Sequence, residues 1–421
     1  MKFLKNLGDI ITEMIKSISL KNFRQIDLKA CDLFGKWYHV TISKNQLNRA
    51  AERGIGIDGS NYGFKGIKSS DMLLFPDLKT AVRDPFYEIP TLSIICNIKE
   101  SNGSGSPLDP RSVAKRALSQ LSGFSPGKLL VSPELEFFAI KSDKSYPQLS
   151  QSYYHAIPPK DYTSNFRSQV VRLMEEMGYK WKYHHSEVAF GQVEIEVPLA
   201  TLVKAADGVM TARYIIENVA KEYGLKISFA PKPKKKFAGS GMHVHQYLAR
   251  RGRSLFYDSK GSYAFLSQLA LCYIGGLLKH TPALCAFTNP APESYQRLVP
   301  GFEAPTKLFY SLGDRSAAIR IPAYALYSDE LRIEYRPPDA TCNIYLTLAA
   351  MLMAGIDGII NRLDPIKEGF GPETPKRKLK SLPTSVEEAK EALRKDHQFL
   401  LHGGVFSEEL IAVWLNNLRM M

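Results

Sequence analysis

The segment Pro133-Glu134-Leu135-Glu136-Phe137-Phe138 places two carboxylates two residues apart in an otherwise apolar stretch. Two later segments repeat this spacing with charged side chains: Met242-His243-Val244-His245 and Arg332-Ile333-Glu334-Tyr335-Arg336. Residues i and i+2 of a β-strand point to the same face, so each segment predicts a strand with one charged and one apolar face. Any one of them fits the solvated face of an antiparallel sheet equally well.

The three segments together supply glutamate, histidine and arginine side chains. Hard divalent cations prefer carboxylate oxygens and tolerate imidazole, and phosphoryl transfer uses arginines and metal ions. If the three charged faces line one cavity, we predict a site that holds metal and phosphate together. Residues 184–194 add Glu187 and Glu194, and Gly239-Ser240-Gly241 precedes His243, where glycine lets the backbone approach a ligand closely.

The remainder of the chain predicts alternating helices and strands. We expect strands over residues 26–31, 37–42, 71–75, 91–98, 129–140, 193–197, 242–248, 317–321 and 331–336. We expect helices over residues 3–16, 110–121, 164–177, 206–223, 344–361 and 386–395. The Gly- and Ser-rich stretch 100–107 reads as a linker, so we predict a small α+β domain over residues 1–105 and a larger one over 106–421.

The composition favours an enzyme that handles anionic substrates. The chain has 421 residues, 44% of them hydrophobic, and a formal net charge of +13. The basic residues are dispersed, and no zinc-finger or RRM signature occurs, so we do not expect nucleic-acid binding. Five cysteines without a CxxC motif argue against a disulfide framework. We find no apolar run of the roughly 20 residues that cross a bilayer and expect a cytoplasmic protein without a membrane partner.

These motifs occur in the order typical of type I glutamine synthetases, and the chain resembles that family from about residue 20 to about residue 415. The motifs that carry the resemblance are Asp58-Gly59-Ser60, Ser70-Asp71-Met72, Glu134-Leu135-Glu136, and residues 184–194, 231–245, 297–305, 314–322 and 332–339.

The resemblance implies an α+β fold with a small N-terminal β-grasp domain and a large C-terminal catalytic domain. The catalytic domain would contain a curved antiparallel sheet flanked by helices. It further implies a homo-oligomer, a hexameric ring that can stack into a dodecamer, with each active site between two subunits. About two or three Mg²⁺ or Mn²⁺ ions would serve each site. One would be held by Glu136, Glu187 and Glu194, and another by Glu134, His243 and Glu334.

The implied reaction joins glutamate to ammonia at the expense of ATP, through a γ-glutamyl phosphate. The resemblance assigns ATP and phosphate binding to His245, Arg315, Arg320 and Arg332, and glutamate binding to Gly239, Arg297 and Arg336. Tyr154 and Glu187 would line the ammonium pocket. Asp58 of a neighbouring subunit would remove a proton from ammonium, Glu303 would shield the intermediate from water, and Arg320 would act on the transferred phosphate.

Four positions depart from the family pattern. Ala238 replaces an Asn beside the glutamate, Asn61 a Ser near the ammonium pocket, Ser186 a His, and Tyr247 a Ser near the nucleotide. These changes leave open a glutamate ligase for a larger amine, such as a polyamine, ethanolamine or methylamine. They also leave open a catalytically silent paralogue that acts as a binding or regulatory subunit.

Two further differences concern regulation and assembly. Lys380 stands where adenylylated family members carry a modified Tyr, so we expect no control by adenylylation. The sequence ends at Met421, whereas family members usually continue into an extension that clamps two rings together. We therefore expect weakened ring stacking, with hexamers or smaller assemblies.

Overall fold

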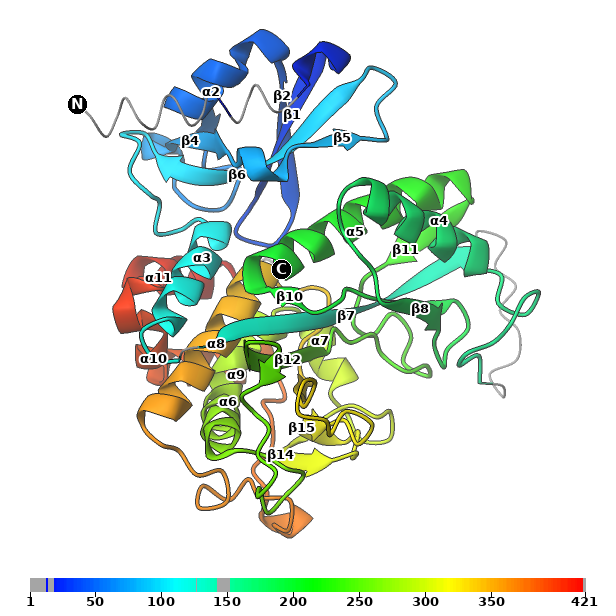
Figure 1. The fold of residues 1–421 in the computed structure, drawn as a ribbon, viewed down its shortest axis with the longest axis vertical. Helices are drawn as coiled ribbons and strands as arrows, with labels where there is room; N and C mark the ends of the chain where they lie inside the picture. The colour runs from blue at the N-terminus through cyan, green and yellow to red at the C-terminus, as the bar shows by residue number, and fades with distance from the viewer. Residues whose placement is uncertain (1–12, 14–18, 126, 142–151, 419–421) are drawn as a thin grey trace.

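The computed structural model describes residue 13 and residues 19–125, 127–141 and 152–418 (Figure 1). The helix expected over residues 3–16 lies almost wholly outside these residues. The described part consists of a small domain, at the top of Figure 1, and a larger one below it.

The small domain is built around one mixed sheet. Its strands are β1 (Gln25–Cys31), β2 (Trp37–Ser43), β3 (Ile55–Asp58), β4 (Asp71–Pro76), β5 (Val82–Asp84) and β6 (Thr91–Glu100), with the helix α2 (Leu47–Arg53). The order is β2-β1-β6-β4-β3, with β5 paired to β6, and β1 and β6 run parallel. The strands expected over residues 26–31 and 37–42 form an antiparallel hairpin, in which Cys31 pairs with Trp37 across the turn. The glycine-containing segment 54–60 forms β3 and the turn after it.

The large domain curls one sheet around the charged segments. Its strands are β7 (Lys128–Lys141), β8 (Tyr183–Ser186), β9 (Gln192–Glu196), β10 (Ala200–Thr201), β11 (Leu225–Ser228), β12 (Val244–Arg250), β13 (Arg253–Ser254), β14 (Lys307–Leu312), β15 (Ala317–Ile321) and β16 (Ile333–Tyr335). The main order is β14-β15-β16-β12-β7-β9-β8. Neighbouring strands are antiparallel, except that β14 and β15 are parallel. The long β7 crosses the middle of the domain (Figure 1).

Helices cover this sheet and carry most of the apolar core. They are α3 (Pro110–Leu121), α4 (Ser164–Glu176), α5 (Leu202–Glu222), α6 (Gln268–Thr288), α7 (Pro292–Arg297), α8 (Ile344–Ile360), α9 (Val386–Lys395), α10 (Gln398–Leu401) and α11 (Glu408–Asn417). The predicted start of α3 is confirmed, since the Asp109 carboxylate accepts hydrogen bonds from the N–H groups of Arg111 and Ser112. Short 3-10 helices span Leu20–Asn22, Lys44–Gln46, Ile67–Ser69, Leu78–Thr80, Lys376–Lys378 and His402–Gly404.

Helix α6 is the largest element that sequence reasoning missed. It is apolar on nearly every side and contains Pro282, so it shows no amphipathic period and carries a helix-breaking signal. Within the described residues it is the helix long and apolar enough to cross a membrane, although the sequence predicted no apolar run of that length. Yet 78% of its apolar window is buried inside the protein, as in a core helix.

Helices α6 and α8 cross at two glycines. A Cβ built on Gly276 would lie 2.8 Å from the Cα of Gly358, closer than side chains approach a backbone. The crossing therefore requires both residues to lack a side chain.

Among the polar contacts that fix the small domain on the large one, those of Arg111 and Asn343 join the two most directly. The Arg111 guanidinium binds both carboxylate oxygens of Asp207 at 2.9 and 2.8 Å, and its other nitrogen donates to Asp77 and Asn97 of the small domain, each at 2.9 Å. This Arg111 bridge is almost completely buried at its centre.

The second contact lies at the start of α8. The Asn343 side chain caps α8 through its oxygen and donates through its nitrogen to the carbonyls of Asp32 and Leu33, at 3.1 and 3.0 Å. Asn343 therefore both caps α8 and holds the turn between β1 and β2 of the small domain.

Candidate active site

The large domain encloses a cavity of about 1450 Å³. The charged strand segments meet in this cavity, as do the loops that follow β7, β8, β11 and β14. Its lining includes the acidic residues Glu134, Glu136, Glu187, Glu194, Glu303 and Glu334 and the basic residues Arg297, Arg315, Arg320, Arg332 and Arg336.

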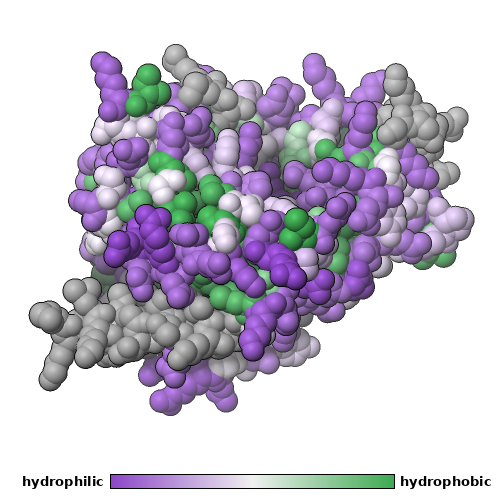
Figure 2. Space-filling view, turned by 90° about the horizontal axis from the view of Figure 1, so that it is seen from above, coloured by the Kyte–Doolittle hydropathy of each residue, from purple (hydrophilic) through white to green (hydrophobic). Residues whose placement is uncertain are grey.

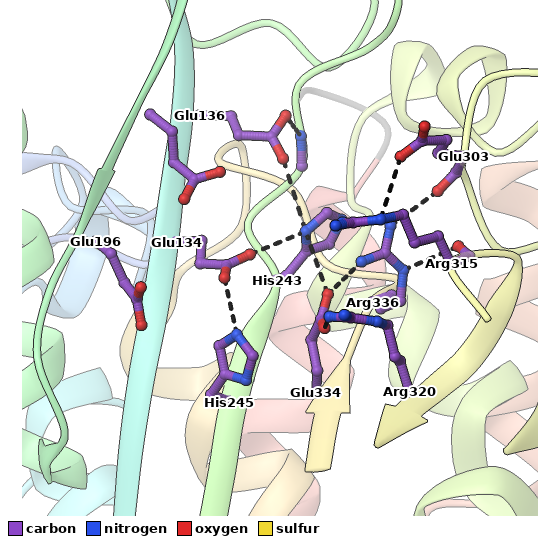
Figure 3. Close-up of polar contacts among 12 residues, drawn as sticks. Glu134, Glu136, Glu196, His243, His245, Glu303, Arg315, Arg320, Glu334 and Arg336 are labelled. Carbon is purple, nitrogen blue, oxygen red and sulfur yellow. Dashed lines mark hydrogen bonds and ion pairs between the residues drawn. The ribbon is translucent and has the colours of Figure 1, made fainter. Parts of the chain in front are cut away.

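The first carboxylate–imidazole cluster consists of Glu134, His243 and Glu334 (Figure 3). These residues lie on or next to β7, β12 and β16, which are consecutive in the sheet. Nδ1 of His243 lies 3.1 Å from Oε2 of Glu134 and 3.8 Å from Oε1 of Glu334. The structure thus brings together all three residues that the family resemblance assigned to one metal ion.

Glu334 also links this cluster to two arginines. Its carboxylate is 1% exposed and binds Arg320 at 2.5 Å, and its other oxygen binds Arg336 (Figure 3). Burial opposes its ionisation, but Arg336 holds its pKa down, to about 2. The carboxylate is therefore ionised at neutral pH and places two guanidinium groups beside the first cluster.

The second cluster is made of His185, Glu187 and Glu194. The His185 ring lies 3.5 Å from each carboxylate, through a different nitrogen for each. Burial and then Glu136 raise the pKa of Glu187 to about 8, and burial with Glu134 raises that of Glu194 well above its usual value. Sequence reasoning did not select His185, although it stands within the quoted segment.

Glu136 pairs with Glu194 of the second cluster across β7 and β9, and its carboxylate also approaches the first cluster. Its Oε2 accepts a hydrogen bond from the N–H of Gly241 at 2.8 Å and another from Nε2 of Gln192 at 3.2 Å. Its Oε1 lies 3.6 Å from Nδ1 of His243. Gln192 was missed as well, although the i and i+2 spacing from Gln192 to Glu194 on β9 could have signalled it.

The donor chemistry of both clusters fits divalent cations. Buried carboxylates crowd together, and among the described residues no lysine or arginine forms an ion pair with Glu187 or Glu194. Charges of like sign in a buried site require a compensating cation or protonation. Carboxylate oxygens with one imidazole nitrogen match the ligands of Mg²⁺ and Mn²⁺.

His245 lies behind the first cluster and does not line the cavity. Its Nε2 is 2.8 Å from Oε1 of Glu134, and its Nδ1 has no hydrogen-bond partner among the described residues. On the far side of this pair, the buried Glu196 is neutralised by Lys182 at 2.9 Å. The structure therefore places His245 as a support for Glu134, one step from the cavity.

Arg297 and the glycines 239 and 241 form the floor of the cavity. Arg297 is 3% exposed and donates to the carbonyls of Pro337 and Arg336 at 2.8 and 3.1 Å. A Cβ on Gly239 would lie 2.7 Å from Cγ of Arg297, and one on Gly241 would lie 2.6 Å from its Nη2. Both glycines are thus required by the close approach of this arginine.

The segment of residues 299–304, here called the flap, covers one side of the cavity. Gly301 and Glu303 both have positive φ angles, 93° and 55°. Arg336 donates to the Glu303 carbonyl at 2.9 Å, and Nε of Arg315 lies 3.8 Å from the Glu303 carboxylate (Figure 3). Arg336, which also binds Glu334 of the first cluster, therefore holds the flap as well.

Tyr154 stands on an aromatic wall next to the second cluster. Its ring stacks on that of His155, with centroids 4.0 Å apart, and meets the His185 ring edge-on at 5.5 Å. Ser186 fixes this wall, because its hydroxyl donates to the carbonyl of Tyr153 at 2.8 Å and accepts from the N–H of Ala156 at 3.0 Å.

Two predicted residues lie apart from the main clusters. Arg332 lines the cavity and contacts Glu330 at 3.3 Å. Asp58 lies in the small domain, does not line this cavity, and binds the hydroxyl of Ser60 at 2.6 Å and the Asn61 amide at 2.9 Å. The structure of a single chain does not bring Asp58 to the other predicted site residues.

Comparisons with known proteins agree on one family. Residues 107–420 match the model "Glutamine synthetase, catalytic domain", and residues 22–101 match "Glutamine synthetase, beta-Grasp domain". The chain is similar to the glutamine synthetase of Nostoc sp., with 40% identity over 96% of this chain and 94% of that protein. It is also similar, with 38% identity over 97% and 95% of the two chains, to a 3-hydroxylaminophenol mutase of Cupriavidus pinatubonensis.

A solved structure extends the similarity to three dimensions. The cryo-EM structure of Plasmodium falciparum glutamine synthetase superposes with a TM-score of 0.87 at 25% identity, and covers 99% of this chain and 95% of that one. The predicted α+β class, with a β-grasp domain followed by a catalytic domain, is thereby confirmed.

Proposed function

Because the chain belongs to the glutamine synthetase family of ATP-dependent carbon–nitrogen ligases, we propose that it joins ammonia to the side-chain carboxylate of L-glutamate. The products would be L-glutamine, ADP and phosphate. The observation that carries the proposal is Glu334, a buried carboxylate shared between a metal-type cluster and two arginines. Such a junction suits a phosphoryl group that is bound to metal and arginine at once.

Divalent cations fit both clusters. Mg²⁺ or Mn²⁺ would be held by Glu134, His243 and Glu334 at one cluster. At the other, Glu187, Glu194 and His185 would supply the donors, with Glu136 between the two. When bound, the ions would neutralise the triphosphate and the charge that develops on the transferred group.

In the first step, the glutamate side-chain carboxylate attacks the terminal phosphate of ATP, which gives γ-glutamyl phosphate and ADP. Arg320, Arg315 and Arg332 would bind the phosphates, since guanidinium groups match phosphate oxygens. Arg336 and the floor formed by Arg297 and Gly239 would orient glutamate.

In the second step, an amine attacks the acyl carbon and phosphate leaves. Tyr154 and Glu187 would hold ammonium against the aromatic wall, and Asp58 of a neighbouring subunit would take its proton. Glu303 on the flap would keep water away from the acyl phosphate.

A ring-shaped homo-oligomer is part of the proposal, because Asp58 lies outside the cavity of its own chain. Asp58 is exposed, and Ile67 of the same domain is 83% exposed. Figure 2 shows apolar side chains gathered among hydrophilic ones on the face seen from above, the side on which the small domain lies. A domain that exposes both this carboxylate and apolar side chains is consistent with a face that a second copy covers.

The deciding experiment measures glutamate-dependent phosphate release from ATP with ammonia, methylamine, ethanolamine and putrescine, with product masses determined in parallel. We expect ammonia to give the highest kcat/KM and a product with the mass of glutamine. Glu194→Gln should lose at least about 100-fold in rate, as metal-site variants do. The control Glu330→Gln, which changes a half-exposed carboxylate on the cavity rim, should keep most of the activity. Absence of phosphate release with every amine would overturn the proposal and favour the silent paralogue.

A second candidate, ligation of glutamate to a larger amine, rests on Ser186. Family members usually have a histidine at this position, whereas the smaller Ser186 places only a hydroxyl group beside the aromatic wall that carries Tyr154. The smaller side chain would leave more room for an amine with carbon substituents. Higher kcat/KM with an alkylamine than with ammonia would support this candidate over the first.

A further inference from the structure

Lys232 connects two segments that meet at the rim of the cavity. Its ammonium nitrogen lies 3.7 Å from the centroid of the Phe302 ring, which belongs to the flap. The same nitrogen donates a hydrogen bond to the carbonyl of Phe237 at 2.6 Å. Lys232 is only 6% exposed, so both contacts form away from bulk water.

The segment of residues 231–241, here called the rim loop, holds this lysine in one position. The N–H of Ser240 donates to the carbonyl of Pro231 at 2.9 Å and closes the base of the loop. Lys232 spans the loop to Phe237, and Gln192 ties the Gly239 carbonyl to β9 at 3.1 Å. Movement at the Lys232–Phe302 contact must therefore come mainly from the flap.

Among the described residues, the other side chains that hold the flap are Arg336, bonded to the Glu303 carbonyl, and Arg315, 3.8 Å from the Glu303 carboxylate. Its turn contains Glu303 in the left-handed region, which a residue with a side chain rarely adopts unless its surroundings hold it there. Arg336 holds the carbonyl of Glu303, whereas the Phe302 ring is 37% exposed and rests on the lysine.

The charge of Lys232 has no acidic partner within residues 19–125, 127–141 and 152–418. A buried ammonium without a carboxylate interacts strongly with the face of an aromatic ring, and more strongly than an exposed one. The Phe302 ring is therefore the flap group that stabilises the Lys232 ammonium, through a cation–π contact.

We propose that Lys232 and Phe302 form a clasp that keeps the flap closed over the acyl phosphate until the amine attacks. Lys232 is then a positioning residue that couples ATP consumption to amide formation. The coupling role rests on the proposed function, because it needs an acyl phosphate to protect. With the clasp open, water attacks the acyl carbon, the bond to the phosphate oxygen breaks, and glutamate, phosphate and a proton are released without an amide.

The test compares Lys232→Met and Phe302→Leu with wild type, and uses Phe302→Tyr as the matched control that keeps the aromatic face. Hydrogen–deuterium exchange of the flap amides is measured on the free protein. We expect exchange about tenfold faster in Lys232→Met and Phe302→Leu, and unchanged in Phe302→Tyr. The double variant should exchange no faster than either single variant, because both changes open the same contact.

The second readout is the ratio of phosphate released to amide formed. It should stay near one in wild type and Phe302→Tyr, and rise several-fold in the two variants that open the clasp. Wild-type exchange rates in both variants would refute the clasp, whatever the activity. Faster exchange with an unchanged ratio would refute the coupling role. A wild type that is inactive with every amine would refute the proposed function and the coupling role, and exchange alone would still decide whether the clasp exists.

Discussion

Replacing Glu334 by Gln tests whether one carboxylate supports both the arginines and the metal-type cluster. The substitution keeps the shape of the side chain but leaves Arg320 and Arg336 without their buried anion. Removing one partner of a buried pair costs about 3–5 kcal/mol. Both arginines keep carbonyl acceptors, at Gly313 and Glu303 among others, so we expect about 3 kcal/mol.

The assay is the thermal midpoint of unfolding, with and without Mn²⁺. A loss of 3 kcal/mol corresponds to roughly 4–5 °C for the large domain. Mn²⁺ at about 100 times its Kd should stabilise wild type by about 2.7 kcal/mol, and should stabilise Glu334→Gln much less. Glu330→Gln is the control, since a half-exposed pair contributes at most about 1 kcal/mol. Equal midpoints and equal Mn²⁺ responses for the two variants would refute the reasoning.

Three further predictions concern separate parts of the protein. Ser186→Ala removes two hydrogen bonds from the wall that carries Tyr154, each worth about 1 kcal/mol, so steady-state kinetics should show the KM for the amine about tenfold higher and the KM for ATP unchanged. Gly241→Ala places a methyl group 2.6 Å from Nη2 of Arg297, so the KM for glutamate should rise at least about tenfold, and a wild-type value would contradict the packing described. Burial disfavours the charged form of His280, but hydrogen bonds to two aspartates raise its pKa overall. Its stabilising effect is thus complete below about pH 6.5 and disappears as pH rises through the higher folded-state pKa. The difference in melting temperature between wild type and His280→Asn should therefore be larger at pH 6 than at pH 9, and a difference independent of pH would show that packing alone accounts for it.

Alternation of charged and apolar residues predicted the strands that carry the site. Glu134 and Glu136 are both on β7, and pairing of β7 with β12 and of β12 with β16 brings the three segments together. Periodicity could not show this pairing, because strand order depends on contacts between distant segments. His243 and Arg336 lie just beyond the ends of their strands, since β12 begins at Val244 and β16 ends at Tyr335.

The sequence could not show how the ligands divide between the clusters. Glu136 was expected beside Glu187 and Glu194; it pairs with Glu194 across β7 and β9, and the N–H of Gly241 and the Gln192 amide hold its carboxylate, which the sequence did not show. His185 joins the second cluster because β8 pairs with β9 and places it opposite Glu194. Helix α6 escaped prediction for a different reason, since a helix buried on all sides has no polar face to mark its period.

The crossing of α6 and α8 links core packing to the geometry of the domain junction. Since no side chain fits between Gly276 and Gly358, even a methyl group there would push the two helices apart. The N-cap residue of α8, Asn343, donates hydrogen bonds to the hairpin turn of the small domain. A displacement of α8 in the apolar core would thus also move the small domain, which carries Asp58. Variants at these two glycines should therefore shift the small domain relative to the large one.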